Sequence, residues 1–199
     1  MRKVVLALGI SLDGYIARPD GAVDFLSMAT KDSGPPGKTY SMGPFFKTVD
    51  TAIMGRKTYD VSLKLSGGSF SNYGMKCYVL SRTQAPGDRG PVTFVNHSPK
   101  ALVEMLRKQP GKAIWHMGGG ELAREFLKDD LIDELYIGVV PILIGEGVPL
   151  FPAGYPQLKF RLIENNTYSK GLVAFRYERL RSKPTDSKPK KAKPAKSKK

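Results

Sequence analysis

The sequence predicts an α/β sandwich with a mostly parallel central sheet that is completed by antiparallel strands. Apolar runs without alternation indicate strands buried on both faces, as in a parallel sheet covered by helices. Helical patterns alternate with these strands as far as Leu127, and the last two strand patterns follow one another without a helix between them. This order of elements favours a parallel sheet with an antiparallel end.

The first predicted strand covers residues 4–10, an uninterrupted apolar run. A long connection follows to about residue 36, because it contains Gly14, Pro19 and the turn-forming segment 34–36, and it leaves room for one helical turn at residues 25–29. Connections of this length are uncommon in compact domains unless they serve a site. Residues 45–48 are typical of the end of a short helix.

Short strands are predicted at residues 51–54, 76–80 and 91–95. After the third, Ser98 offers a helix N-cap and Pro99 suits the first helical position. That helix ends at Pro110-Gly111.

The next predicted strand, residues 113–117, runs directly into Gly118-Gly119-Gly120 and a helix whose apolar residues recur up to Leu127. A further strand is predicted at residues 135–142. Residues 159–163 and 172–180 predict an antiparallel hairpin that turns around Asn165-Asn166.

The charge divides the chain into a predicted domain, residues 1–180, and a predicted disordered basic tail, residues 181–199. The chain has 199 residues, which fits one domain, and a net charge of +14. Nine of the 32 Lys and Arg residues and one of the 18 acidic residues lie in the tail, so the tail carries +8 and the domain +6. The tail has no large apolar residue to offset the entropy of ordering it. It is either an arm for nucleic acid or another polyanion, or a solubilising extension.

Several classes of protein are excluded by composition. Cys77 is the single cysteine, which excludes a disulfide scaffold and a zinc ribbon, and it is interpreted as an inert core residue. The apolar run at residues 4–10 is short for a signal peptide and far shorter than the roughly 20 residues of a membrane span. We expect a soluble, cytoplasmic protein.

Three predicted strand ends carry groups that suit a phosphate. They are Gly118-Gly119-Gly120 at a helix N-terminus, Gly55-Arg56-Lys57-Thr58, and Ser81-Arg82-Thr83. In open α/β sheets ligands bind beyond the carboxyl ends of the strands, so the three ends together indicate one shared anionic ligand. Taken singly, the glycines could form a tight turn, and the arginines could be ordinary solvated charges.

Five motifs in chain order resemble the dihydrofolate reductase superfamily. More narrowly, they are similar to the C-terminal reductase domain of the bifunctional riboflavin-biosynthesis deaminase-reductase. The motifs are SLDGYIA (11–17), IMGRKTY (53–59), LSRT (80–83), GGGEL (118–122) and DELY (133–136). The resemblance, which extends over residues 2–180, implies a dihydrofolate-reductase-like three-layer sandwich and hydride transfer from NADPH. A separate deaminase domain is not expected in a chain of this length.

The resemblance also implies a cofactor site. Gly118, Gly119 and Gly120 would hold the pyrophosphate of NADPH, with Arg56, Lys57 and Thr58 helping. Gly55 and Glu121 are also candidate cofactor-binding residues. The adenosine 2′-phosphate would meet Ser81 and Arg82. The nicotinamide would be bordered by Gly9, Ile16 and Ala17.

Two departures from dihydrofolate reductases argue against folate reduction. The position of the carboxylate that binds the pteridine falls near Ala29, with Asp24 and Asp32 out of step, and Gly138 stands where those enzymes usually have Thr. The riboflavin-type branch instead implies 5-amino-6-(5-phosphoribosylamino)uracil as substrate. Lys31 and Lys38 are candidates to bind its phosphate.

Positioning of cofactor and substrate does most of the work in such a reductase, so no nucleophile or metal motif is expected. Asp24 is the candidate catalytic proton donor, with capping of the short helix as the alternative. Asp13 is interpreted as a turn residue. His116 is interpreted as a packed residue, and neither it nor His97 has metal-ligand spacing.

Two classes of function remain open. The first is an NADPH-dependent reductase of a small nitrogen heterocycle, with pterin reduction as a variant. The second is a nucleic-acid-associated protein in which a reductase-like body carries the basic tail. The intact cofactor motifs favour the first, and the resemblance implies a homodimer formed through sheet edges or the final strands.

Overall fold

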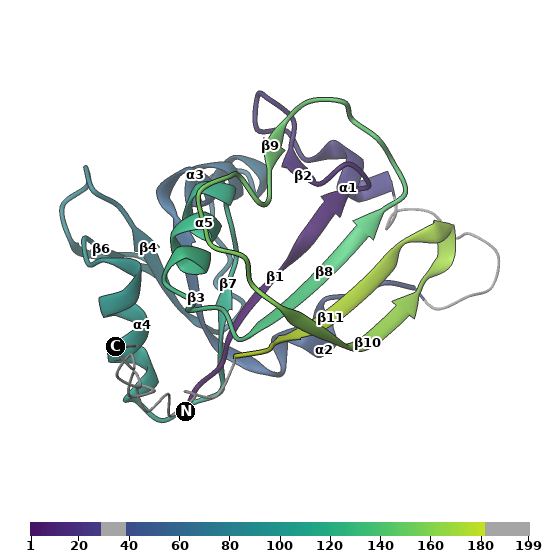
Figure 1. The fold of residues 1–199 in the computed structure, drawn as a ribbon. Coiled ribbons are helices and arrows are strands. Elements are labelled where there is room, and N and C mark those ends of the chain that lie inside the picture. The colour runs from purple at the N-terminus through teal and green to yellow at the C-terminus, as the bar shows by residue number, and fades with distance from the viewer. Residues whose placement is uncertain (29–38, 182–199) are drawn as a thin grey trace, which may run out of the picture.

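The computed structural model describes residues 1–28 and 39–181, which form a mixed α/β fold around one large sheet (Figure 1). In these ranges the sheet has nine strands. In spatial order they are β10 (Phe160–Thr167), β11 (Val173–Arg179), β8 (Glu134–Val140), β1 (Val4–Ser11), β7 (Ala113–His116), β3 (Val49–Gly55), β4 (Lys76–Leu80), β6 (Val92–Val95) and β5 (Gly87–Arg89). All pairs from β8 to β6 are parallel, whereas β10, β11 and β5 pair antiparallel. The predicted fold class is confirmed.

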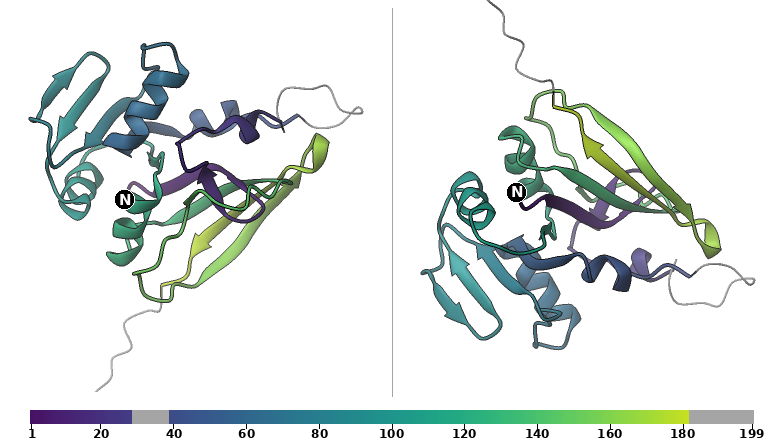
Figure 2. Two further views of the ribbon diagram at one scale, coloured as in Figure 1. Left: turned by 90° about the horizontal axis from the view of Figure 1, so that it is seen from above. Right: turned by 90° about the horizontal axis from the view of Figure 1, so that it is seen from below.

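Helices cover both faces of the parallel part of the sheet (Figure 2). The helices are α1 (Asp24–Met28), α2 (Gly43–Phe46), α3 (Arg56–Leu65), α4 (Pro99–Arg107) and α5 (Gly120–Lys128). One core joins α4 and α5 to β1 residues such as Leu6, and the other joins α2 and α3 to residues such as Ala7 on the opposite face of β1. Successive side chains of a strand point to opposite faces, so β1 contributes to both cores.

The helix starts follow from local sequence in two ways. Ser98 caps α4 as predicted, since its side chain accepts a hydrogen bond of 3.2 Å from the Ala101 N–H, and Pro99 is the first helical residue. By contrast, α3 and α5 begin after Gly55 and Gly119, which have no capping side chain. Helix α3 is not among the predicted elements. Its sequence lacks the strong apolar stripe that marks α4, and none of its residues is fully buried in the structure.

The final hairpin turns later than the sequence predicted. Asn165 and Asn166 lie inside β10, opposite Phe175 and Ala174, so the turn expected around them is wrong in position. The chain reverses instead at the 3-10 turn η1 (Ser169–Gly171). Gly171 adopts a φ of 76° there, which a residue without a Cβ takes up at no steric cost.

A small second sheet lies across the carboxyl end of the main one. It pairs β2 (Tyr15–Ala17) with β9 (Val148–Pro149), two strands too short to leave a sequence pattern. Asp13 supports it, because its carboxylate accepts hydrogen bonds from Ser11 Oγ (2.5 Å) and from the N–H groups of Ile144 (3.1 Å) and Gly145 (2.8 Å). Asp13 therefore joins the connections that follow β1 and β8, in addition to its predicted place in a turn.

Several predictions fall on residues outside the described ranges. They concern Ala29, Lys31, Asp32, Lys38 and the tail from residue 182 onward. Within the ranges that are described, no helix is both long and apolar enough to cross a membrane.

Candidate cofactor and substrate site

The predicted cofactor residues lie close together at the carboxyl ends of the central parallel strands. Strands β1, β7, β3 and β4 are consecutive neighbours and parallel, so their carboxyl ends lie side by side. Gly9 lies in β1, Gly55 ends β3, Ser81 follows β4, and Gly118 follows β7. Segments separated by up to about 110 residues of chain are thereby assembled into one site, at the place where α/β sheets bind ligands.

The three glycines after β7 allow a close approach of backbone segments. Gly118 has a φ of 108°, a conformation that side chains disfavour. A Cβ on Gly119 would lie 3.3 Å from Thr58 Oγ1 and 3.7 Å from Ile16 Cδ1. Gly119 and Thr58, both predicted to hold the pyrophosphate, therefore lie together with Ile16, which was predicted to border the nicotinamide. A Cβ on Gly120 would lie only 2.1 Å from the carbonyl oxygen of Pro149 in β9, which leaves no room for a side chain.

Two helix N-termini face this site without side-chain caps. The N-caps of α3 and α5 are Gly55 and Gly119. The Gly55 N–H lies 3.5 Å from the Gly118 carbonyl oxygen, so the starts of the two helices are adjacent. Uncapped N–H groups and the positive ends of two helix dipoles fit a diphosphate, provided that the glycines let it approach the backbone.

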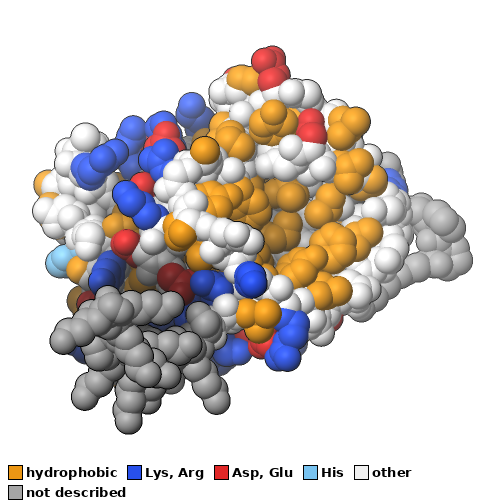
Figure 3. All heavy atoms as spheres, in the orientation of Figure 1, with side chains coloured by type: hydrophobic (Ala, Val, Ile, Leu, Met, Phe, Trp, Pro, Cys, Tyr) orange, Lys and Arg blue, Asp and Glu red, His pale blue; other side chains and the backbone are white. Residues whose placement is uncertain are grey.

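Charged side chains surround these helix starts. Lys57 Nζ lies 3.2 Å from Glu121 Oε1, and Arg56 pairs with Asp60 one turn further along α3. Both pairs are exposed, and exposed pairs contribute little, so a bound phosphate can replace the carboxylates. In the space-filling view, Lys and Arg side chains gather over α3 and α5 (Figure 3). Glu121 thus lies at the site through its contact with Lys57.

The two residues predicted to meet the 2′-phosphate differ in their surroundings. Ser81 is buried, and its Oγ accepts hydrogen bonds from the N–H groups of Thr83 (3.3 Å) and Gln84 (3.0 Å), so it shapes the turn after β4. Arg82 is exposed and has no ion-pair partner among the described residues. A free guanidinium at a strand end is well placed for a phosphate.

Asp24 is not positioned as the predicted proton donor. Its carboxylate accepts two hydrogen bonds from Arg18, at 2.7 and 3.0 Å, and half of its side chain is exposed. The hydrogen bonds from Arg18 hold the pKa of Asp24 below its ordinary value. The carboxylate is therefore ionised at neutral pH, and its arrangement argues against a role as general acid.

His116, the last residue of β7, contacts the glycine segment that follows it. It is completely buried, its Nδ1 accepts a 2.9 Å hydrogen bond from the Gly118 N–H, and its ring packs edge-on against Phe126. Burial lowers the pKa of His116 to about 4, so the imidazole is neutral. The prediction of a packed histidine is confirmed.

A cavity of about 300 Å³ opens between the carboxyl halves of β1 and β8 and the segments around α1 and α2. Gly9, predicted to border the nicotinamide, is part of its wall. The other lining residues are apolar or aromatic: Ala7, Leu8, Leu26, Tyr40, Met42, Phe46, Tyr73, Trp115, Met117, Gly138, Val140 and Leu172. Its aromatic residues come from three separate segments, around residues 40–46, 73 and 115, so no single motif in the sequence indicated them.

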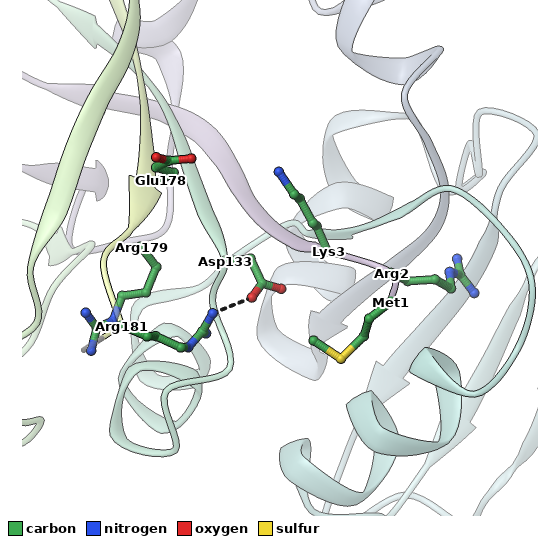
Figure 4. A pocket seen from close by; sticks show the side chains of 7 residues that line it. All are labelled: Met1, Arg2, Lys3, Asp133, Glu178, Arg179 and Arg181. Atoms are coloured by element: carbon green, nitrogen blue, oxygen red, sulfur yellow. Dashed lines mark hydrogen bonds and ion pairs between the residues drawn. The ribbon is translucent and has the colours of Figure 1, made fainter. Parts of the chain in front are cut away.

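A second cavity, of about 250 Å³, lies at the opposite end of β1 and is lined by charged side chains (Figure 4). Its charges are neutralised within the fold: Arg181 donates to Asp133 at 2.7 Å, Lys3 pairs with Glu134, and Arg179 pairs with Asp130. This end of the sheet holds the first and last described residues together. This cavity lies at the amino end of β1, whereas the predicted cofactor residues lie at the carboxyl ends of the strands.

Comparison with known proteins finds a matching family model and several similar proteins. The family model for the RibD C-terminal domain matches residues 2–174. Two uncharacterised proteins of Bacillus subtilis (strain 168) are similar along most of their length. YwjB is 38% identical over 161 residues, covering 81% of this chain and 89% of YwjB. YyaP is 31% identical over 186 residues, covering 88% of this chain and 94% of YyaP.

A solved structure with similar architecture is that of a candidate riboflavin biosynthesis protein from Shewanella sp. PV-4. It superposes with a TM-score of 0.76 at 31% identity, and the match covers 91% of this chain and all of that one. The likeness therefore extends over most of this chain and the whole of that one.

Proposed function

The chain belongs to the family of RibD C-terminal domains, and from that premise we propose that it is a reductase that binds NADPH. Residues at the carboxyl ends of β1, β7, β3 and β4 would hold the cofactor, and the cavity beside Gly9 would hold the small nitrogen heterocycle that is reduced. The observation that carries the proposal is the convergence of Gly119, Thr58 and Ile16 at two adjacent, uncapped helix starts.

Each group has a defined task in this proposal. The N–H groups at the starts of α3 and α5 bind the diphosphate, with Lys57 and Arg56 neutralising its charge. Arg82 binds the 2′-phosphate, which distinguishes NADPH from NADH. NADPH, when bound, supplies the hydride. The side chains around Gly9 exclude water from the reacting atoms and hold the two partners at reacting distance.

The resemblance to the riboflavin-type reductase domain implies 5-amino-6-(5-phosphoribosylamino)uracil as substrate, which makes it the first compound to assay. One similar solved structure is that of a protein named for riboflavin biosynthesis. Pterin reduction is the less favoured variant, because the described cavity wall offers no carboxylate for a pterin ring. Binding of nucleic acid by the basic tail is a separate proposal. It is tested by removing residues 182–199, which should abolish retention on DNA at low salt and leave cofactor affinity unchanged.

Titration with NADPH and NADH tests the cofactor assignment, with quenching of Trp115 emission as the readout. The Arg82→Ala variant should bind NADPH about tenfold or more weakly, because a charge-assisted hydrogen bond contributes about 1.5–3 kcal/mol. Its affinity for NADH should stay unchanged. Arg161→Ala, on the edge strand β10, is the control and should behave like the unmodified protein.

Two outcomes would contradict the proposal. Absence of NADPH binding at high micromolar concentration would remove the reductase function altogether. An Arg82→Ala variant that still prefers NADPH over NADH would leave the cofactor in place but exclude Arg82 as the ligand of the 2′-phosphate.

A further inference from the structure

We infer that Asp13 is a positioning residue of the proposed reductase: through Ser11, its carboxylate holds strand β2, which carries Ile16, in place beside Gly119. This inference rests on the proposed function and adds to it a residue that acts on the nicotinamide end of the cofactor through other residues. Three observations support it: the hydrogen bonds of Asp13, the pairing of β2 with β9, and the proximity of Ile16 to the glycine segment.

The carboxylate of Asp13 joins two segments that are far apart in the chain. Its Oδ1 accepts a 2.5 Å hydrogen bond from the hydroxyl of Ser11, the last residue of β1. Its Oδ2 accepts hydrogen bonds from the N–H groups of Ile144 (3.1 Å) and Gly145 (2.8 Å), which lie 131 and 132 residues later, after β8. The hydrogen bond from Ser11 holds the pKa of Asp13 below its ordinary value, so the group is ionised at neutral pH and both oxygens act as acceptors.

Ser11 connects this carboxylate to the start of β2. Ser11 is fully buried, and its Oγ accepts a 3.0 Å hydrogen bond from the N–H of Tyr15, the first residue of β2. A hydroxyl has a single hydrogen, so the acceptor on Asp13 decides which side of the Ser11 oxygen faces the Tyr15 N–H. Without that acceptor, the Ser11 hydroxyl would turn to the carbonyl oxygen of Tyr15, 3.4 Å away, and β2 would lose its fixed start.

Strand β2 is held from its other side by β9, and the two lie side by side beyond the ends of β1 and β8 (Figure 1). Ala17 lies opposite Val148, and a Cβ on Gly147 would be only 2.3 Å from the carbonyl oxygen of Ala17, so the two backbones are in direct contact. The connection that leads into β9 includes Gly145, a donor to Asp13. The carboxylate therefore holds both strands of the small sheet at their bases.

Ile16 links this small sheet to the proposed cofactor site. Its Cδ1 would be 3.7 Å from a Cβ on Gly119, the N-cap of α5, and Thr58 Oγ1 would be 3.3 Å from the same point. Hydride transfer requires the reacting atoms to be held about 3–3.5 Å apart, so a shift of β2 would disturb the reaction. The N–H groups proposed to bind the diphosphate belong to α3 and α5, which Asp13 does not contact. Loss of Asp13 should therefore affect the nicotinamide end of the cofactor and not the phosphate end.

A matched pair of ligands, NADPH and 2′-phospho-ADP-ribose, tests the inference, because the second lacks only the nicotinamide ring. Both are titrated calorimetrically into the full-length protein and its variants. Asp13→Ala should bind NADPH about fivefold more weakly, because the ligand must then order β2 itself, and its affinity for 2′-phospho-ADP-ribose should stay within about twofold. Asp13→Asn should lose less, since its amide oxygen can still accept from the N–H groups after β8.

Asp20→Ala is the matched control. Asp20 is a loop carboxylate that accepts a 2.9 Å hydrogen bond from the Ala22 N–H, within its own turn, so this variant should bind both ligands like the unmodified protein. An unchanged NADPH affinity in Asp13→Ala would overturn the inference. So would an equal loss for the two ligands, because Asp13 would then support the fold as a whole and not the nicotinamide end.

Ser11→Ala tests the connection between Asp13 and β2. This variant should reproduce the selective loss of NADPH affinity, and the double variant should lose no more than Asp13→Ala alone, since the two side chains act in series. Losses that add up would exclude Ser11 as the link and contradict the inference. The unmodified protein keeps the two hypotheses apart: if it binds neither ligand, the proposed function fails, whereas if it binds both and the variants change nothing, only the role of Asp13 fails.

Discussion

Replacing Gly120 by alanine tests whether the contact between α5 and β9 positions the N–H groups that are proposed to bind the diphosphate. The added Cβ would lie 2.1 Å from the carbonyl oxygen of Pro149, a backbone atom that no rotamer change can move. Real Cβ contacts stay at 3.0 Å or more, so the two segments must separate by about 1 Å. Because Gly120 starts α5, that movement also displaces the N–H groups proposed to bind the diphosphate.

Two opposing effects set the magnitude. Alanine is favoured over glycine within a helix by up to about 1 kcal/mol, whereas overpacking costs about 1–3 kcal/mol or more when backbone must shift. We expect Gly120→Ala to lower the free energy of unfolding by about 2 kcal/mol. NADPH affinity should fall about tenfold, a loss of about 1.4 kcal/mol of binding free energy. Urea denaturation and NADPH titration measure the two quantities.

Gly43→Ala is a matched control, since Gly43 also starts a helix, α2, and its Cβ would meet only the side-chain oxygen of Ser41, at 3.3 Å. This variant should unfold within about 0.5 kcal/mol of the unmodified protein. The reasoning is refuted if Gly120→Ala is equally neutral and binds NADPH normally, because β9 would then not press on the start of α5.

Two further predictions concern buried groups. The folded-state pKa of His116, about 4, lies below its ordinary 6.5, so unfolding takes up a proton between these values and stability should fall by about 3 kcal/mol as the pH is lowered from 6.5 to 4. His116→Asn keeps an acceptor for the Gly118 N–H, and a denaturation series that still showed this pH dependence in the variant would exclude His116 as its source. Removing Arg176, which donates to the buried Glu134 at 2.8 Å, should cost about 3 kcal/mol in urea denaturation, because Lys3 alone would then neutralise that carboxylate. Arg161→Ala removes an exposed pair with Glu178 and should cost under about 1 kcal/mol, so equal losses in the two variants would contradict the assignment.

The elements predicted correctly are those whose signals are local. The capped start of α4 at Ser98 and the apolar run of β1 each follow from neighbouring residues. The pairing of β2 with β9 was not predictable, because it places Tyr15 opposite Pro149 in two strands of only two or three residues, which are too short to show a side-chain pattern. The hairpin turn was misplaced because Asn165-Asn166 has the composition of a turn, while the reversal depends on Gly171.

The residues of the candidate site also fall into those that local sequence indicates and those that only tertiary packing brings together. The glycines after β7 and the arginines after β3 and β4 were recognisable, because phosphate binding needs specific groups at strand ends. The cavity wall was not, since Phe46, Tyr73 and Trp115 become neighbours only when distant segments pack. The surroundings of Asp24 were equally hidden, because its pairing with Arg18 depends on how the loop between them folds.

The position of Met1 and Arg181, the first and last described residues, has a consequence for how the protein can be attached to a partner or a surface. Met1 and Arg181 border the same charged cavity at the amino end of β1, a strand of eight residues that spans roughly 25 Å to the opposite edge. Arg181 forms ion pairs with Asp130 and Asp133 there, at the end of β1 opposite the proposed cofactor site. An attachment made at Arg181 would therefore leave the proposed cofactor site, at the other end of β1, accessible.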